Sequence, residues 1–338
     1  MSVSSQRLGA QTVCFSAPPY IISSAAVGGK MEGKGPLSRY FDLIGKDSFW
    51  GEKTWEKAET AMQKLAISHA LEKAGMQRSD IDCCFGGDLL NQCTGTSFAL
   101  RDLGIPFLGL YNACATFGES LLLAAALIDG GFLRTAAAVS SSHYCTAERQ
   151  YRMPMPYGAQ RTPTQQWTAT AAGCCILAKD GDAPRITRAT VGRIIDLGVT
   201  DANNMGAAMA PAAVDTLCAY FRDSGETPSA FDQILTGDLG ALGHAIVTEQ
   251  LAESGYAVER LYGDCGLMLY DRKAQDMHCG GSGAGCSASV FSGYLMELMR
   301  EKHWHRLLFA PTGALLSPTS SFQKESIPAI CHAVVIES

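Results

Sequence analysis

The sequence predicts a layered α/β fold in which helices pack on mixed β-sheets, and three observations support this prediction. Strand-like and helical patterns alternate along most of the 338 residues. Hydrophobic residues make up 47% of the chain and charged residues only 18%, so the chain can bury a large core. The order of elements in the first 180 residues then recurs in the remainder, which indicates a duplicated half.

The elements of the first half follow from hydrophobic periodicity. Apolar residues recur near helical spacing over 50–74, and Gly75 ends that predicted helix. A buried helix is expected where the sequence is apolar on every side, as it is directly after Cys114. The remaining elements are, in order, a strand over 81–85, a helix over 97–103, a strand over 106–110, the buried helix over 114–128, and strands over 135–141 and 170–177.

The second half repeats a motif of the first. Residues 231–239 echo residues 81–89, so that Asp238 follows Asp88 by 150 residues. Small residues over 283–288 open a second long helix, as they do around Cys114, and a strand over 306–311 follows. We therefore predict one αβαβα half over residues 1–180 and another over 181–338, each with a central buried helix.

Composition excludes several classes of protein. The net charge of −6 and the lack of a Lys/Arg cluster argue against nucleic-acid binding. The longest apolar stretch is too short to span a bilayer and no secretory leader opens the chain, so we expect no transmembrane segment and no secretion. The 13 cysteines are odd in number and include no Cys-x-x-Cys, which is typical of a reducing compartment and disfavours structural zinc.

Cys114 is the first candidate functional residue. It lies between a predicted strand and the buried helix, so its thiol is expected at a helix N-terminus, where unpaired N–H groups and the helix dipole favour the thiolate. A cysteine in this place is either a nucleophile or the floor of an anion-binding pocket. The alternative is a small buried apolar side chain without a function.

These features resemble known families at two levels. A duplicated αβαβα half with a cysteine before the central helix is similar to the thiolase and ketoacyl-synthase superfamily. Longer stretches resemble, more narrowly, the stage V sporulation protein AD family, and together they cover almost the whole chain. These stretches are residues 87–92, 141–143, 146–150, 205–213, 235–239, 264–268, 312–318 and 323–328.

The narrower resemblance implies a role in binding and transport. Members of that family are associated with the uptake of dipicolinic acid, largely as its calcium chelate, into the developing spore. The resemblance therefore implies dipicolinate as the ligand, with calcium, and no other cofactor. It also implies partner proteins of the same uptake system and a place on the cytoplasmic side of, or peripheral to, the inner spore membrane. A homodimer is expected because related folds dimerise through an edge strand of the first half.

The resemblance also implies a loss of catalysis. Ketoacyl synthases of this fold pair the cysteine with a histidine from a His-Gln-Ala-Asn motif and with a second His or Asn from a glycine-rich motif. At the corresponding strand end this chain has Asp238, and its glycine-rich run over 280–286 contains Ser282 but no Asn or His. We therefore predict a non-catalytic binding protein. The alternatives are an acyltransferase that uses Cys114 and a purely structural partner of a membrane channel.

The remaining candidate ligand-binding residues follow from the chemistry of a flat dicarboxylate and of calcium. Asp88 and Asn91 come just after a strand, where ligands of α/β proteins collect, and Asp88 is the candidate calcium contact. His143 and Arg149 are candidate donors to a carboxylate, and Met205 is a candidate wall of the pocket. The alternatives are turn-stabilising roles for Asp88 and His143, an ion pair for Arg149 and a core position for Met205.

Overall fold

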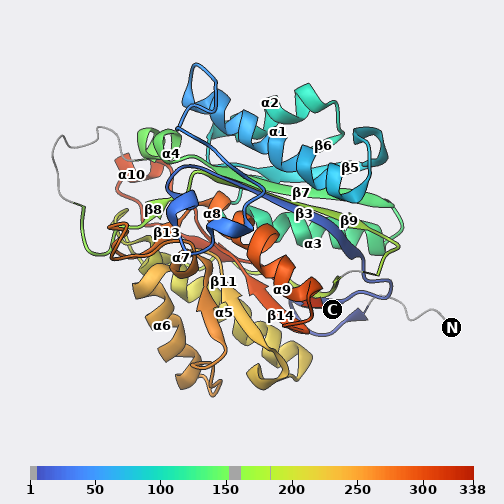
Figure 1. Ribbon diagram of the computed structural model, residues 1–338. Helices are drawn as coiled ribbons and strands as arrows, with labels where there is room; N and C mark the ends of the chain where they lie inside the picture. The colour runs from blue at the N-terminus through green and yellow to red at the C-terminus, as the bar shows by residue number, and fades with distance from the viewer. Residues whose placement is uncertain (1–5, 152–160, 183) are drawn as a thin grey trace.

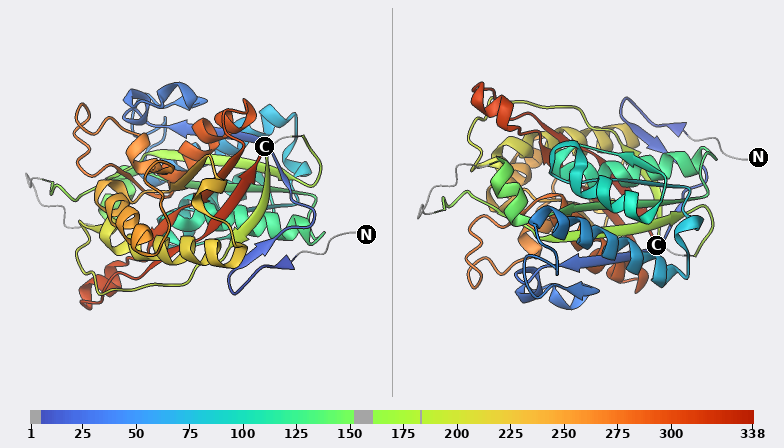
Figure 2. Two further views of the ribbon diagram at one scale, coloured as in Figure 1. Left: turned by 90° about the horizontal axis from the view of Figure 1, so that it is seen from below. Right: turned by 90° about the horizontal axis from the view of Figure 1, so that it is seen from above.

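Two layers of β-sheet lie between three layers of helices in the computed structural model (Figure 1), which describes residues 6–151, 161–182 and 184–338. Figure 2 shows the two outer helical layers face-on, one from below and one from above. The predicted duplicated, layered α/β fold is confirmed.

The upper sheet is built by the first half of the chain. β3 runs antiparallel to β9 and β9 antiparallel to β7, whereas β7, β5 and β6 are parallel. The order across the sheet is β3 (Tyr20–Gly28), β9 (Ala171–Ala178), β7 (Thr135–Ser142), β5 (Cys83–Gly87) and β6 (Phe107–Gly109).

The second half repeats this order with the same strand directions. Its strands are β10 (Arg185–Thr190), β17 (Ala333–Glu337), β14 (Arg306–Ala310), β11 (Gln233–Thr236) and β12 (Tyr262–Asp264). β5 and β11 occupy equivalent places, so Asp88 and Asp238 follow equivalent strands. A pair between Tyr20 and Arg185 joins β3 to β10. The division of the chain at residue 180 stays a prediction.

The helices fill the three remaining layers (Figure 1). The upper layer holds α1 (Trp55–Ala74) and α2 (Thr94–Leu103), and the lower layer holds α5 (Met205–Ser224) and α6 (Gly240–Glu253). Between the sheets lie α3 (Thr116–Asp129) and α8 (Ala284–Val290), which continues through the π-helical turn Phe291–Leu295 into α9 (Met296–Arg300).

Helix boundaries differ from the predicted ones for local reasons. α1 begins at Trp55, not at residue 50, because the Thr54 side chain accepts a hydrogen bond from the backbone N–H of Lys57. The central helix begins at Thr116, because Ala113–Ala115 form a 3₁₀ turn that includes Cys114. α3 then packs between the two sheets, and the ring of Phe117 meets those of Phe291 and Phe309 at centroid distances of 5.6 and 6.4 Å. A helix buried on both faces needs an apolar sequence all round.

Short elements complete the structure and gather near the ends of the central strands. β8 (Trp167–Thr168) pairs with β13 (Gly281–Ser282), and β15 (Thr312–Ala314) pairs with β16 (Ala329–Cys331). The other short elements are α4 (Tyr144–Tyr151), α7 (Cys265–Met268), α10 (Pro318–Phe322), β1 (Gln6–Arg7), β2 (Thr12–Cys14) and β4 (Leu43–Ile44). All 13 cysteines are free thiols. Over the described ranges, no helix is both long and apolar enough to cross a membrane.

Candidate functional site

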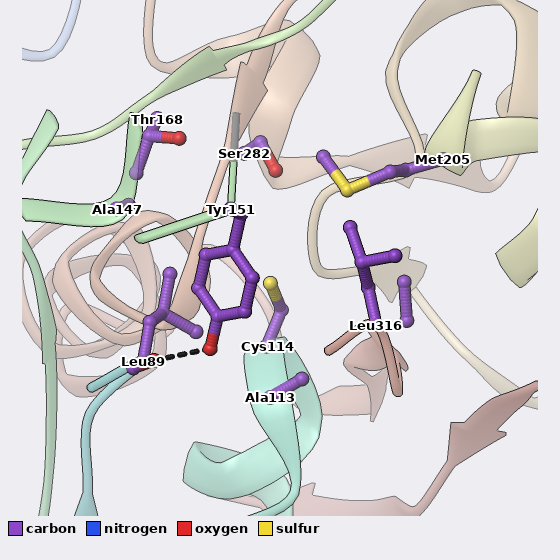
Figure 3. A pocket seen from close by; sticks show the side chains of 10 residues that line it. Leu89, Ala113, Cys114, Ala147, Tyr151, Thr168, Met205, Ser282 and Leu316 are labelled. Atoms are coloured by element: carbon purple, nitrogen blue, oxygen red, sulfur yellow. Dashed lines mark hydrogen bonds between the residues drawn. The ribbon is translucent and has the colours of Figure 1, made fainter. Parts of the chain in front are cut away.

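A cavity lies at the start of the central helix α3, directly over the thiol of Cys114 (Figure 3). Its free volume is about 40 Å³, which is room for a few water molecules. Residues of both halves line it: Leu89, Ala113, Cys114, Ala147, Tyr151, Thr168, Met205, Ser282, Ala314 and Leu316.

The turn before α3 presents Cys114 to this cavity. Ala113 adopts a left-handed conformation with a φ of 49°, which is uncommon for a residue other than glycine. The hydroxyl of Thr116 stabilises the turn, because it accepts a hydrogen bond from the Asn112 N–H at 3.1 Å and donates one to the Ala113 carbonyl at 2.7 Å. Cys114 itself is only 7% exposed, so its thiol forms the floor of the cavity.

Asp238 lies beneath this floor and interacts with the Cys114 thiol. One oxygen of its carboxyl group accepts hydrogen bonds from the Gly283 N–H at 2.8 Å and the Ser282 hydroxyl at 3.2 Å. Burial raises the pKa of Asp238 to about 7. Burial, and next the negative charge of Asp238, raise the pKa of Cys114 well above its usual range. The expectation that this thiol favours the thiolate is therefore wrong, since desolvation and a neighbouring carboxylate outweigh the helix dipole.

The structure brings some of the other predicted residues to the cavity. Ser282 lies on β13 and Met205 at the first position of α5, and both contribute to its wall (Figure 3). Together with Cys114 and Asp238 they come from four separate parts of the chain. Their role in binding a ligand stays a prediction.

Asp88 does not reach the cavity, and the expected calcium contact there is not supported by its geometry. The side chain is fully buried, and both of its carboxyl oxygens accept hydrogen bonds from the protein. One oxygen accepts from the Leu90 N–H at 2.8 Å, and the other accepts from the Thr96 N–H and hydroxyl at 2.7 and 2.6 Å. Asp88 therefore stabilises its own loop and the first turn of α2, the alternative that the sequence left open.

His143, Asn91 and Arg149 also lie outside the cavity lining. The ring of His143 is buried, with Nε2 2.8 Å from the Ser48 carbonyl and Nδ1 accepting from the Cys145 N–H at 3.2 Å, so neither nitrogen is available to a ligand. Arg149 forms an ion pair with Glu56 and lies over the ring of Trp55. Asn91 and Arg149 both face a separate surface groove.

The cavity chemistry is mostly apolar. Its polar groups are the Cys114 thiol and the hydroxyls of Ser282, Thr168 and Tyr151, and none of the described residues that line it is Lys, Arg or His. In the part of the chain that the structure describes, no three His, Cys, Asp or Glu side chains are grouped to hold a metal ion. A bare dianion would therefore find hydroxyl donors here but no positive side chain among these residues.

Comparison with known proteins identifies the family. The family model of stage V sporulation protein AD matches residues 9–337. The stage V sporulation protein AD of Bacillus subtilis (strain 168) is 43% identical over 329 residues, which cover 97% of each chain. The chain belongs to the stage V sporulation protein AD family.

Solved structures show that this family member has a thiolase-like fold. The 3-oxoacyl-[acyl-carrier-protein] synthase III of Aquifex aeolicus VF5 aligns with a TM-score of 0.60 over 95% of this chain and 100% of its own, at 13% identity. A variant of OleA from Xanthomonas campestris aligns with a TM-score of 0.61 over 95% and 98% of the two chains, at 16% identity. At such identities the likeness extends to the fold alone.

Sequence reasoning missed several residues that line the cavity, notably Leu89, Thr168 and Tyr151. Leu89 and Leu316 fall within stretches that carried the family resemblance, so a wider choice of candidates in those stretches would have included them. Tyr151 gives no signal in the sequence. It reaches the cavity because α4 ends there, which is a tertiary feature.

Proposed function

We propose that this protein binds dipicolinate as its calcium chelate in the cavity over Cys114 and takes part in dipicolinate uptake into the developing spore without catalysing acyl transfer. We further propose that it acts with other proteins of the same uptake system at the cytoplasmic side of the inner spore membrane. Family membership supports the physiological role, and the electrostatics of the cavity support the form of the ligand.

The observation that supports the chelate is the charge of the site. The lining residues described include no cationic side chain, and a buried carboxyl group lies beneath the floor. The free dianion of dipicolinate would lose its hydration without an opposite charge, which is costly. One calcium ion neutralises both carboxylates, and hydroxyl and carbonyl oxygens such as Ser282 Oγ, Thr168 Oγ1 and the Leu89 carbonyl suit calcium as ligands.

The raised pKa of the Cys114 thiol supports a binding role rather than catalysis. A cysteine nucleophile reacts as the thiolate, and a neighbouring base or positive charge normally promotes that form. Here the neighbour is Asp238, and both burial and this carboxylate raise the pKa of the thiol. The thiol then contributes shape and a weak donor to the cavity floor.

An acyltransferase that uses Cys114 is the second candidate. The apolar walls of the cavity and the synthase-like fold favour it. His332 is buried near the same turn, but its Nε2 lies 2.9 Å from the Asn112 side chain and its Nδ1 accepts from the Gly192 N–H, so it orders the turn. Release of carrier thiol from an acyl thioester, with a covalent adduct on Cys114, would favour this candidate.

The edge strand β6 supports the proposed homodimer. β6 is at one end of the order of paired strands, and Leu108 on it is 52% exposed. Tyr111, which follows this strand in the sequence, is also exposed, and so is Phe98 on α2. Pairing of β6 with its copy would satisfy the open edge and cover Leu108. Sedimentation velocity at micromolar concentration should show a dimer, and a monomer would contradict this assembly.

Calorimetric titration tests the proposed function. We expect saturable binding of dipicolinate with equimolar calcium, and affinity weaker by about tenfold or more for dipicolinate alone. Arg149→Ala is a matched control, because Arg149 is a plausible carboxylate donor by sequence but lies outside the cavity lining, so its removal should leave affinity unchanged. Absence of binding in both conditions, or tight binding of the free dianion alone, would overturn the proposal.

A further inference from the structure

We infer that the phenol ring of Tyr151 occupies the place that the aromatic ring of the ligand takes, so that Tyr151 must swing out before a ligand reaches Cys114. Tyr151 thereby decides which molecules the cavity admits. The identity of the ligand rests on the proposed function, whereas the shielding of Cys114 by Tyr151 does not.

The contacts of Tyr151 place its ring inside the cavity. The ring lies between Leu89 and Cys114 (Figure 3), and it packs against the small apolar cluster that these residues form with Ala147. Its hydroxyl donates a hydrogen bond to the Leu89 carbonyl, and the hydroxyl of Tyr111 lies 3.2 Å away. The ring is thus held as a bound aromatic molecule would be, by apolar walls and two polar contacts.

The size of the cavity requires a displacement. The free volume of about 40 Å³ holds a few water molecules but not a six-membered ring with two carboxylates. Tyr151 is the aromatic side chain among the described lining residues, and it is the last residue of α4. Rotation of this one side chain vacates a space of the size and flatness of a six-membered ring and gives up the hydrogen bond to Leu89.

The Leu89 carbonyl, which loses the hydrogen bond from Tyr151 when that side chain swings out, restricts the chemistry of the ligand. Once the hydroxyl departs, the Leu89 carbonyl keeps the hydrogen bond from the Gln150 side-chain amide at 2.9 Å, and its other lone pair loses its donor. A carboxylate cannot replace that donor, because two acceptor oxygens repel each other, whereas a metal cation or an N–H or O–H group can. The geometry therefore selects a flat six-membered aromatic ring that carries a bound divalent cation over the corresponding free dianion.

Thiol labelling tests the shielding without any ligand. The rate of alkylation of Cys114 by N-ethylmaleimide is measured by peptide mass spectrometry in the wild type, Tyr151→Phe and Tyr151→Ala. Loss of the ring should speed the labelling of Cys114 about tenfold or more, and loss of the hydroxyl alone should change it far less. Cys145, half-buried on the same helix α4, is the internal control, because its rate rises if α4 unfolds. Equal rates at Cys114 in the wild type and Tyr151→Ala would overturn the inference.

A ligand titration separates this inference from the proposed function. With calcium and dipicolinate, Tyr151→Phe and Tyr151→Ala should bind severalfold tighter than the wild type, because less must be displaced. Weaker binding in both variants would overturn the inference, since Tyr151 would then be a ligand contact. Faster labelling of Cys114 in Tyr151→Ala without binding in any variant would uphold the shielding and overturn the proposed function.

Discussion

Asp88 and Asp238 follow equivalent strands of the two halves, yet their surroundings give them different roles. Both are fully buried, and each comes within two residues of the end of the parallel strand next to the edge of its sheet. Asp88 accepts strong hydrogen bonds on both oxygens, at 2.6 to 2.8 Å. One oxygen of Asp238 accepts from the Gly283 N–H at 2.8 Å and the Ser282 hydroxyl at 3.2 Å, the other lies 3.5 Å from the Thr312 hydroxyl, and the Cys114 thiol is a further partner of the carboxyl group.

This difference in hydrogen bonding explains why only one of the two equivalent aspartates in the duplicated fold belongs to the cavity site. Asp88 is saturated by its own loop, so it stabilises the fold and cannot serve a ligand. It also acts on a second buried acid, because burial and then the charge of Asp88 raise the pKa of Glu59 to about 8. Asp238 instead shares hydrogen bonds with Cys114 and Ser282, two residues that line the cavity, so it can gain or lose a proton in response to the cavity.

The same substitution at both positions should have opposite consequences, and the larger effect is expected at Asp88. Asp88→Asn turns one acceptor oxygen into an NH₂ group that faces a backbone N–H in a fully buried position. We expect a loss of roughly 3 to 5 kcal/mol in the free energy of unfolding, measured by urea denaturation at pH 7.5. A loss below 1 kcal/mol would contradict this difference, because the substitution would then be tolerated at Asp88 as it is expected to be at Asp238.

Asp238→Asn should be tolerated, and its effect should depend on pH. The new NH₂ group can face Thr312 and the Cys114 sulfur, both of which can accept, while the remaining oxygen keeps Gly283 and Ser282. The pKa of Asp238 rises from 3.8 to about 7 on folding, so the native state holds a proton between these values that the unfolded chain releases. The stability that this carboxyl contributes is therefore present below pH 4 and is lost as pH rises to 7.

The Asp238→Asn variant lacks that titration. Its free energy of unfolding should therefore increase, relative to that of the wild type, by roughly 2 to 4 kcal/mol between pH 4 and pH 8. Denaturation curves of both proteins at the two pH values measure this difference. A constant offset between variant and wild type would show that Asp238 does not titrate in this window.

The sequence predicted the fold well because periodicity and repetition are local signals. The apolar run after Cys114, the small residues after Gly283 and the echo of Asp88 at Asp238 each mark an element that recurs at an equivalent place in the structure. The strand order across each sheet was not predicted, since nothing in the spacing of residues states which strands pair.

The site was predictable only in part, because it is assembled by tertiary contacts. Cys114, Asp238 and Ser282 were found since motifs marked them, and they meet. His143 and Arg149 have the right chemistry but are satisfied by Ser48 and Glu56, residues about 95 positions away in the chain. Whether such a residue is available to a ligand depends on contacts with side chains far from it in the sequence. The pKa of Cys114 was misjudged for the same reason, since the helix terminus is visible in the sequence but the burial and Asp238 are not.

The central claim is that Cys114 shapes the cavity and is not a nucleophile, and calorimetry on two variants tests it most directly. Cys114→Ser keeps the volume and a donor, so affinity for the calcium chelate of dipicolinate should stay within about threefold of the wild type. Cys114→Trp fills the cavity and should abolish binding while a thermal melt shows that the protein remains folded. Complete loss of binding in folded Cys114→Ser would contradict the account, because that is the result expected if a thiolate must react, an unactivated hydroxyl being a far weaker nucleophile.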